Sequence, residues 1–95
     1  MPSGLPGGEF VVRGLLDLAR GRETAGALLV SIGAPRLRLG GLDVEAPLPD
    51  AEHRLYALLS RESPDDAHAR YNALLRRLVS FERALALTRL GSVTE

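Results

Sequence analysis

The feature of this chain that most constrains its fold is a long stretch near the C-terminus that contains neither proline nor glycine. It lies between Pro64 and Gly91. Apolar residues recur in it at alternating steps of four and three, which is the spacing of one face of an α-helix. The sequence therefore predicts one amphipathic helix about 40 Å long. Its apolar residues are Ala67, Tyr71, Leu74, Leu78, Phe81 and Leu85.

Both ends of this helix carry signals of their own. Ser63 suits the N-cap and Pro64 the first helical position, and Asp65 and Asp66 would face the positive end of the helix dipole. Gly91 is a typical residue for the end of a helix. We therefore expect the helix to begin directly after Ser63 and to end at Gly91.

The length of this helix predicts self-association. A compact chain of 95 residues has a radius of gyration of only about 12 Å. The other segments are too short to cover a helix of about 40 Å, so part of its apolar face would remain for a second copy. We therefore expect a homodimer. Five residues are expected to be central to the dimer contact or to the core: Tyr71, Leu74, Leu78, Phe81 and Leu85.

The rest of the chain is also mainly helical by pattern. As helices, residues 9–20 would have one apolar face and one charged face, and residues 50–62 would have one apolar side. Residues 24–32 are apolar almost all round. The middle segment reads as a buried helix or strand, and its alanines and leucines favour the helix. We predict a mainly α four-helix domain over residues 9–95. Residues 1–8, with two prolines and three glycines, are expected to form a flexible arm.

Residues 36–45 allow two interpretations. In the first, Gly40 and Gly41 form a two-residue turn, and the flanking residues pair as a short β-hairpin. Leu37 would then face Val44 and Arg38 would face Asp43. In the second, a short helix begins at Pro35 and ends at the two glycines. Since Leu39 would also face Leu42 and Arg36 would face Glu45, two apolar pairs and two pairs of opposite charge favour the hairpin.

Composition excludes several classes of protein. The chain has no Cys, which rules out disulfides and thiolate metal sites. Its longest uncharged run after the arm has about a dozen residues, whereas a transmembrane helix needs about twenty. No catalytic, phosphate-binding or metal-binding motif is present, so we expect no enzyme activity, cofactor or metal. The predicted location is the cytoplasm.

Glu82 is an unusual residue for its position, because it falls inside the apolar stripe of the long helix. A buried carboxylate needs a partner. One interpretation is an acid or base with a raised pKa in a pocket. The interpretation we favour is a structural ion pair with Arg89 or with an arginine of a second subunit.

The outer side of the same helix carries an arginine strip, which we define as Arg70, Arg76, Arg77 and Arg83. Asn72 and Ser80 lie near it. Such a strip suits phosphate groups, which makes a nucleic-acid-binding protein the alternative function. However, twelve basic and twelve acidic residues give a net charge of zero, and Asp65 and Asp66 would repel a phosphate backbone. A non-enzymatic protein-interaction or scaffold module, acting as a homodimer, is therefore the function that we expect.

Overall fold

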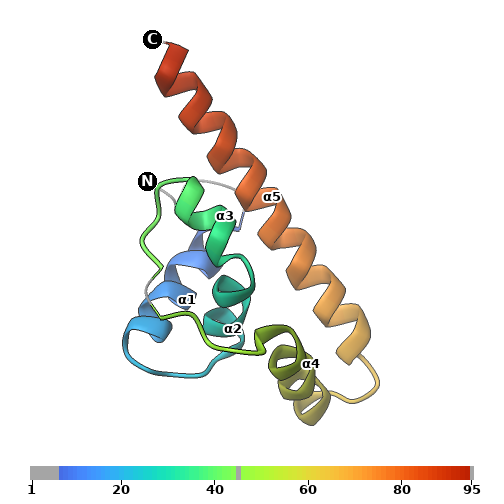
Figure 1. Ribbon diagram of the computed structural model, residues 1–95. Helices are drawn as coiled ribbons and strands as arrows, with labels where there is room; N and C mark the ends of the chain where they lie inside the picture. Colours follow the sequence, from blue (N-terminus) through green and yellow to red (C-terminus); the bar gives the residue numbers. More distant parts are fainter. Residues whose placement is uncertain (1–6, 45, 95) are drawn as a thin grey trace.

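The computed structural model describes residues 7–44 and 46–94, and within the last helix it describes side chains as far as Leu87. The described residues contain five helices and no strand, which confirms the predicted mainly α class (Figure 1). The helices are α1 (Gly8–Ala19), α2 (Ala25–Ile32), α3 (Ala34–Leu39), α4 (Ala51–Glu62) and α5 (Ala67–Thr94). None of these helices is both long and apolar enough to cross a membrane.

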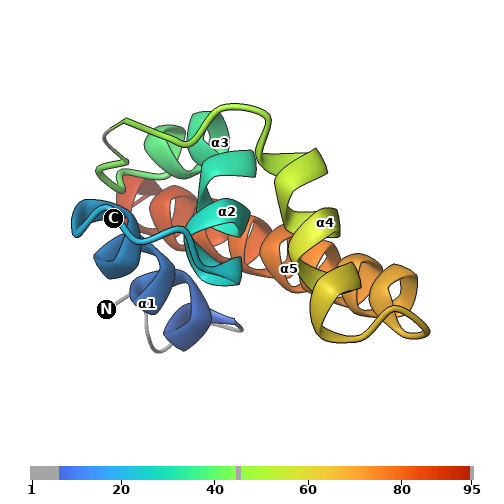
Figure 2. The same ribbon diagram turned by 90° about the horizontal axis from the view of Figure 1, so that it is seen from below.

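The centre of the fold is α2, which contacts each of the other four helices (Figure 2). Residues 27–31 of α2 are all buried, as the uniformly apolar pattern of this segment predicts. The helix begins at Thr24, whose hydroxyl accepts a hydrogen bond of 3.2 Å from the amide of Ala27. This N-cap satisfies one of the free donors of the first turn, so a short helix of eight residues has a well-defined start.

Two glycines allow α1 and α2 to cross closely. A Cβ atom built on Gly14 would overlap the backbone carbonyl of Gly26, and one built on Gly26 would lie 3.0 Å from the Cα of Gly14. The two backbones are therefore in direct contact. Gly14 of α1 and Gly26 of α2 are thus the two halves of this contact.

The long helix α5 has the apolar face that its spacing predicts. Leu78, Phe81 and Leu85 are buried in the core of the single chain, and Tyr71 and Leu74 pack against that core. The predicted packing residues are thus used within one chain. With 28 residues, α5 is about 42 Å long, and the molecule measures 48 × 25 × 19 Å with a radius of gyration of 13.5 Å.

Both ends of α5 differ from the predicted ends. The helix begins at Ala67 instead of directly after Ser63, because residues 64–66 form a turn. The Ser63 hydroxyl donates to the Asp66 carboxylate at 3.3 Å. At the other side the helix continues past Gly91 to Thr94. Gly91 therefore does not end it, which is consistent with the modest cost of about 1 kcal/mol for glycine inside a helix.

The favoured hairpin over residues 36–45 is wrong, and the competing short helix is correct. Residues 34–39 form α3, and Gly41, with φ of 96°, closes it. The Leu42 amide donates to the Leu37 carbonyl at 3.0 Å and the Gly41 amide to the Arg38 carbonyl at 3.0 Å, which is a Schellman motif. Gly40 has an ordinary helical φ of −76°, so the glycine pair does not form the hairpin turn. The domain consequently has five helices instead of four.

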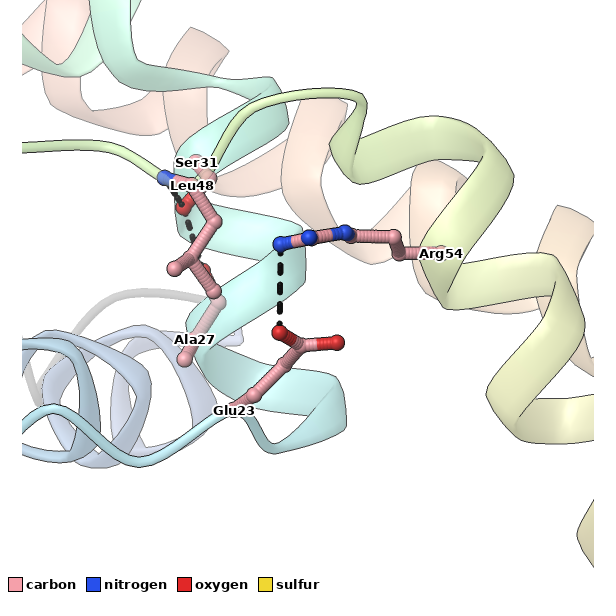
Figure 3. A network of polar contacts seen from close by, with 5 residues as sticks. All are labelled: Glu23, Ala27, Ser31, Leu48 and Arg54. Atoms are coloured by element: carbon pink, nitrogen blue, oxygen red, sulfur yellow. Dashed lines mark hydrogen bonds and ion pairs between the residues drawn. The ribbon is translucent and has the colours of Figure 1, made fainter.

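Polar contacts hold the loops onto this helical frame (Figure 3). The Ser31 hydroxyl donates to the Ala27 carbonyl at 2.8 Å and accepts from the Leu48 amide at 2.9 Å, which ties the loop before α4 to the buried side of α2. An ion pair of 3.2 Å between Arg54 and Glu23 joins α4 to the loop before α2. Together they hold both loops against the central helix.

The Arg38 side chain holds the loop after α3, whereas the hairpin interpretation placed this side chain elsewhere. Arg38 donates from Nε at 2.9 Å and from Nη2 at 2.6 Å to the backbone carbonyl of Val44. In the hairpin it would have opposed Asp43. Arg36, expected opposite Glu45, instead pairs with α5, and Glu45 lies outside the described residues. The two arginines thus secure α3 on both sides.

Candidate interaction surface

A shallow groove runs along the outer side of α5. It is lined by Asn72, Leu75, Arg76, Val79, Ser80 and Arg83, and we call it the α5 groove. These residues follow helical steps of three and four, so they share one side of the helix. Leu75 and Val79 are half-buried and form its apolar floor, whereas Arg76 and Arg83 are exposed at its edge. The groove therefore combines an apolar strip with positive charge.

The structure divides the predicted arginine strip into three parts. Arg76 and Arg83 come together in the α5 groove, with Asn72 and Ser80 beside them as the sequence predicted. Arg70 instead forms an ion pair of 3.3 Å with Glu62 of α4. Arg77 points away from the groove, and a Cβ atom built on Gly7 would lie 3.2 Å from its backbone carbonyl. Two of the four arginines thus remain for a ligand at this surface.

A second exposed feature lies near the last part of the core. Leu39 at the end of α3 is 79% exposed and Leu87 of α5 is 69% exposed. Leu39 adjoins Gly40, which packs against Leu85, the last described buried residue along α5; Leu87, two residues further, lies on the opposite side of that helix. Beyond this point α5 projects past the other helices (Figure 1). Leu87 is thus a large apolar side chain on the part of α5 that its own chain leaves exposed.

Glu82 lies in the seam between α3 and α5. Its side chain is only 9% exposed and forms an ion pair of 3.5 Å with Arg36, whose side chain is 73% exposed. A Cβ atom built on Gly33 would lie 2.8 Å from the Glu82 carboxylate, so the glycine makes room for it. Glu82 therefore pairs with Arg36 of α3, a partner that was not named from the sequence. Arg89, the predicted partner, has a side chain outside the described residues.

The surroundings of Glu82 favour its protonated form. Burial raises the pKa of the Glu82 carboxyl, and the nearby Arg36 charge and hydrogen bond oppose that rise without cancelling it. Glu82 is thus a paired carboxylate in the seam between α3 and α5, and it is not among the residues that line the α5 groove.

This raised pKa predicts how stability depends on pH. The folded chain holds the Glu82 proton more tightly than the unfolded chain does, so the contribution to stability is complete at low pH and is lost as pH rises through the folded-state pKa. We expect Glu82→Gln, which imitates the protonated form, to be modestly more stable than the native chain near neutral pH. The advantage should vanish below about pH 4.

Urea unfolding at a series of pH values measures this difference. Glu9→Gln on the exposed side of α1 serves as the control, because it makes the same chemical change at an exposed position. If Glu82→Gln were less stable than the native chain near neutral pH, the pair with Arg36 would outweigh the burial of the charge.

The remaining titratable groups do not assemble into a metal site among the described residues. His68, at the start of α5, instead contacts the ring of Tyr56 with centroids 6.5 Å apart, and Tyr56 contacts Tyr71 at 5.4 Å, both edge to face. Burial and the negative charge of Glu52 raise the pKa of Tyr71. These rings join α4 to α5, which is a packing role.

Sequence reasoning missed three residues of these surfaces. The partner of Glu82 is Arg36, 46 positions away, and no local pattern connects the two residues. Leu39 and Leu87 were not selected because a leucine in a helix is expected to be buried. Their exposure follows from how far α3 and the core reach along α5, and only the tertiary arrangement reveals it.

Comparison of the chain with protein-family models, with curated proteins and with solved structures gives no match.

Proposed function

We propose that this chain is a non-enzymatic protein-interaction module that acts as a homodimer through the projecting part of α5. The observation that carries the proposal is the exposure of Leu87, a large apolar side chain that its own chain leaves uncovered where α5 begins to project (Figure 1). Burial of such side chains against a second copy is favourable by about 25 cal/mol for each Å² of apolar surface removed from water.

The proportions of the molecule support this assignment. α5 accounts for most of the 48 Å long axis, whereas the other two axes are 25 and 19 Å. Leu87, where this helix begins to project from the small core, is left exposed by its own chain. Two copies that align these projecting parts would cover each other, and a chain of 10.2 kDa gains more from such burial than a large domain does.

The experiment is light scattering on a size-exclusion column with the native chain and Leu87→Asp. We expect a native mass of about twice 10.2 kDa and a variant mass near 10.2 kDa. The melting temperature of the variant monomer should remain well above room temperature, because Leu87 is mostly exposed within one chain. A charge buried in the dimer contact without a partner is expected to weaken dimerisation by several kcal/mol.

Leu16→Asp is the matched control for this test. Leu16 lies on α1 and is also exposed, so the same chemical change is made at a surface outside the proposed contact. This control should remain dimeric. A native chain that stays monomeric up to about 1 mM would overturn the homodimer, since 1 mM corresponds to only about 4 kcal/mol of binding free energy.

A further inference from the structure

The α5 groove carries positive charge that the described part of the chain does not neutralise. Arg76 and Arg83 are exposed and form no ion pair with any described residue, unlike Arg36, Arg54 and Arg70. No acidic side chain lines the groove. Two free guanidinium groups therefore stand at the edge of an apolar floor.

The spacing of the two arginines matches a helical partner. They are seven residues apart, which is two turns or about 10.5 Å along α5. A second helix that lies along the groove would repeat its own side chains at the same interval. Carboxylates at positions i and i+7 of that helix would meet Arg76 and Arg83, and apolar residues at i+3 and i+4 would meet the floor formed by Leu75 and Val79.

The same geometry disfavours a second copy of this chain as the occupant. Two α5 helices that pair antiparallel about a two-fold axis between Val79 and Ser80 would bring Arg76 of one copy opposite Arg83 of the other. Like charges would then face each other at both ends of the contact. The groove is thus complementary to an acidic surface and not to itself.

Phosphate groups are a poorer match than carboxylates on a helix. A nucleic-acid surface would place charged phosphates over Leu75 and Val79, whose half-buried apolar side chains offer them no donor. The groove also contains no aromatic residue on which a base could stack.

From charge and spacing together, we propose that the α5 groove is a docking surface for an acidic amphipathic helix of another protein. The proposal concerns residues that do not include Leu87, which lies about one turn beyond Arg83 on the same side of α5. The two surfaces can be tested separately on the same full-length chain.

The test uses a fluorescent peptide of about three heptads, with Glu at i and i+7 and Leu at i+3 and i+4. Binding to the full chain is followed by fluorescence anisotropy. We expect saturable binding that weakens as salt is added. Arg76→Glu combined with Arg83→Glu should weaken it at least about tenfold, because two attractive contacts become repulsive. Val79→Ser should weaken it as well by making the floor polar.

Two controls make the result specific. Arg13→Glu combined with Arg20→Glu makes the same change of charge at the same sequence spacing, on α1 and at its C-cap, where both arginines are exposed, and should leave binding almost unchanged. A peptide with Lys in place of Glu should not bind the native chain, but should bind the variant with Glu at positions 76 and 83.

Three results would overturn the proposal. The acidic peptide could show no saturable binding up to about 1 mM. The variants of α1 could weaken binding as much as those of α5, which would indicate a general effect of net charge. A single-stranded oligonucleotide could bind more tightly than the peptide and lose its binding with Arg76 and Arg83, in which case the groove would be a nucleic-acid surface.

Discussion

Phe81→Ala is expected to lower the free energy of unfolding by about 3–5 kcal/mol. Phe81 is 0% exposed and is the largest of the fully buried side chains described. Its ring fills the space between α5 and the rest of the core, so its removal leaves a cavity that the surrounding helices can close only in part. A domain of this length has a total stability of about 5–14 kcal/mol, which makes this single change a large fraction of the whole.

Urea unfolding followed by circular dichroism measures the loss. Leu16→Ala serves as the control, because it removes a comparable apolar side chain that is exposed on α1 and should change stability by less than about 0.5 kcal/mol. A cost below about 1 kcal/mol for Phe81→Ala would show that this ring is not packed in the folded chain. The same result would contradict the packing of α5 against the core.

Gly14→Val is expected to cost about 3 kcal/mol or more, through overpacking instead of a cavity. Even one added carbon at Gly14 would overlap the backbone carbonyl of Gly26. A backbone atom cannot turn aside as a flexible side chain can, so the two helices must move apart. Since α2 is buried on all sides, that movement would also disturb its contacts with α4 and α5.

Ala19→Val is the matched control on the same helix. Ala19 is exposed at the end of α1, so this change carries only the small cost of a β-branched residue in a helix, a few tenths of a kcal/mol. Thermal unfolding of the two variants separates the stability cost of close packing from the stability cost of a lower helix propensity. Equal melting temperatures would contradict the close crossing of α1 and α2.

The fold could be predicted from sequence wherever a helix carries its own periodic pattern. The apolar face of α5 was correct residue by residue, because Leu78, Phe81 and Leu85 recur at helical spacing and are all buried. The buried helix over residues 25–32 was also found, since it is apolar all round and begins at Thr24. These features depend on local physics alone.

The prediction failed where two local rules conflicted. Gly40 and Gly41 suit a hairpin turn and a helix end equally well, and the flanking charges made the hairpin attractive. The structure decides for the helix because Arg36 and Arg38 find better partners elsewhere, in the Glu82 carboxylate and the Val44 carbonyl. Such contacts depend on tertiary packing, and no window of sequence contains them. Four groove residues, Asn72, Arg76, Ser80 and Arg83, could be named from sequence, but the apolar floor of the groove and the division of the arginines could not.

The central position of α2 has a consequence for how this protein holds together. Because every other helix contacts α2, no pair of helices forms a separate hydrophobic core. If one helix loses its contact with α2, α2 is held less firmly against the remaining helices. The chain must therefore fold and unfold as one cooperative unit. A fragment made by cutting the chain in the loop before α4 would lack half of the surroundings of α2. Such a fragment has no reason to fold alone.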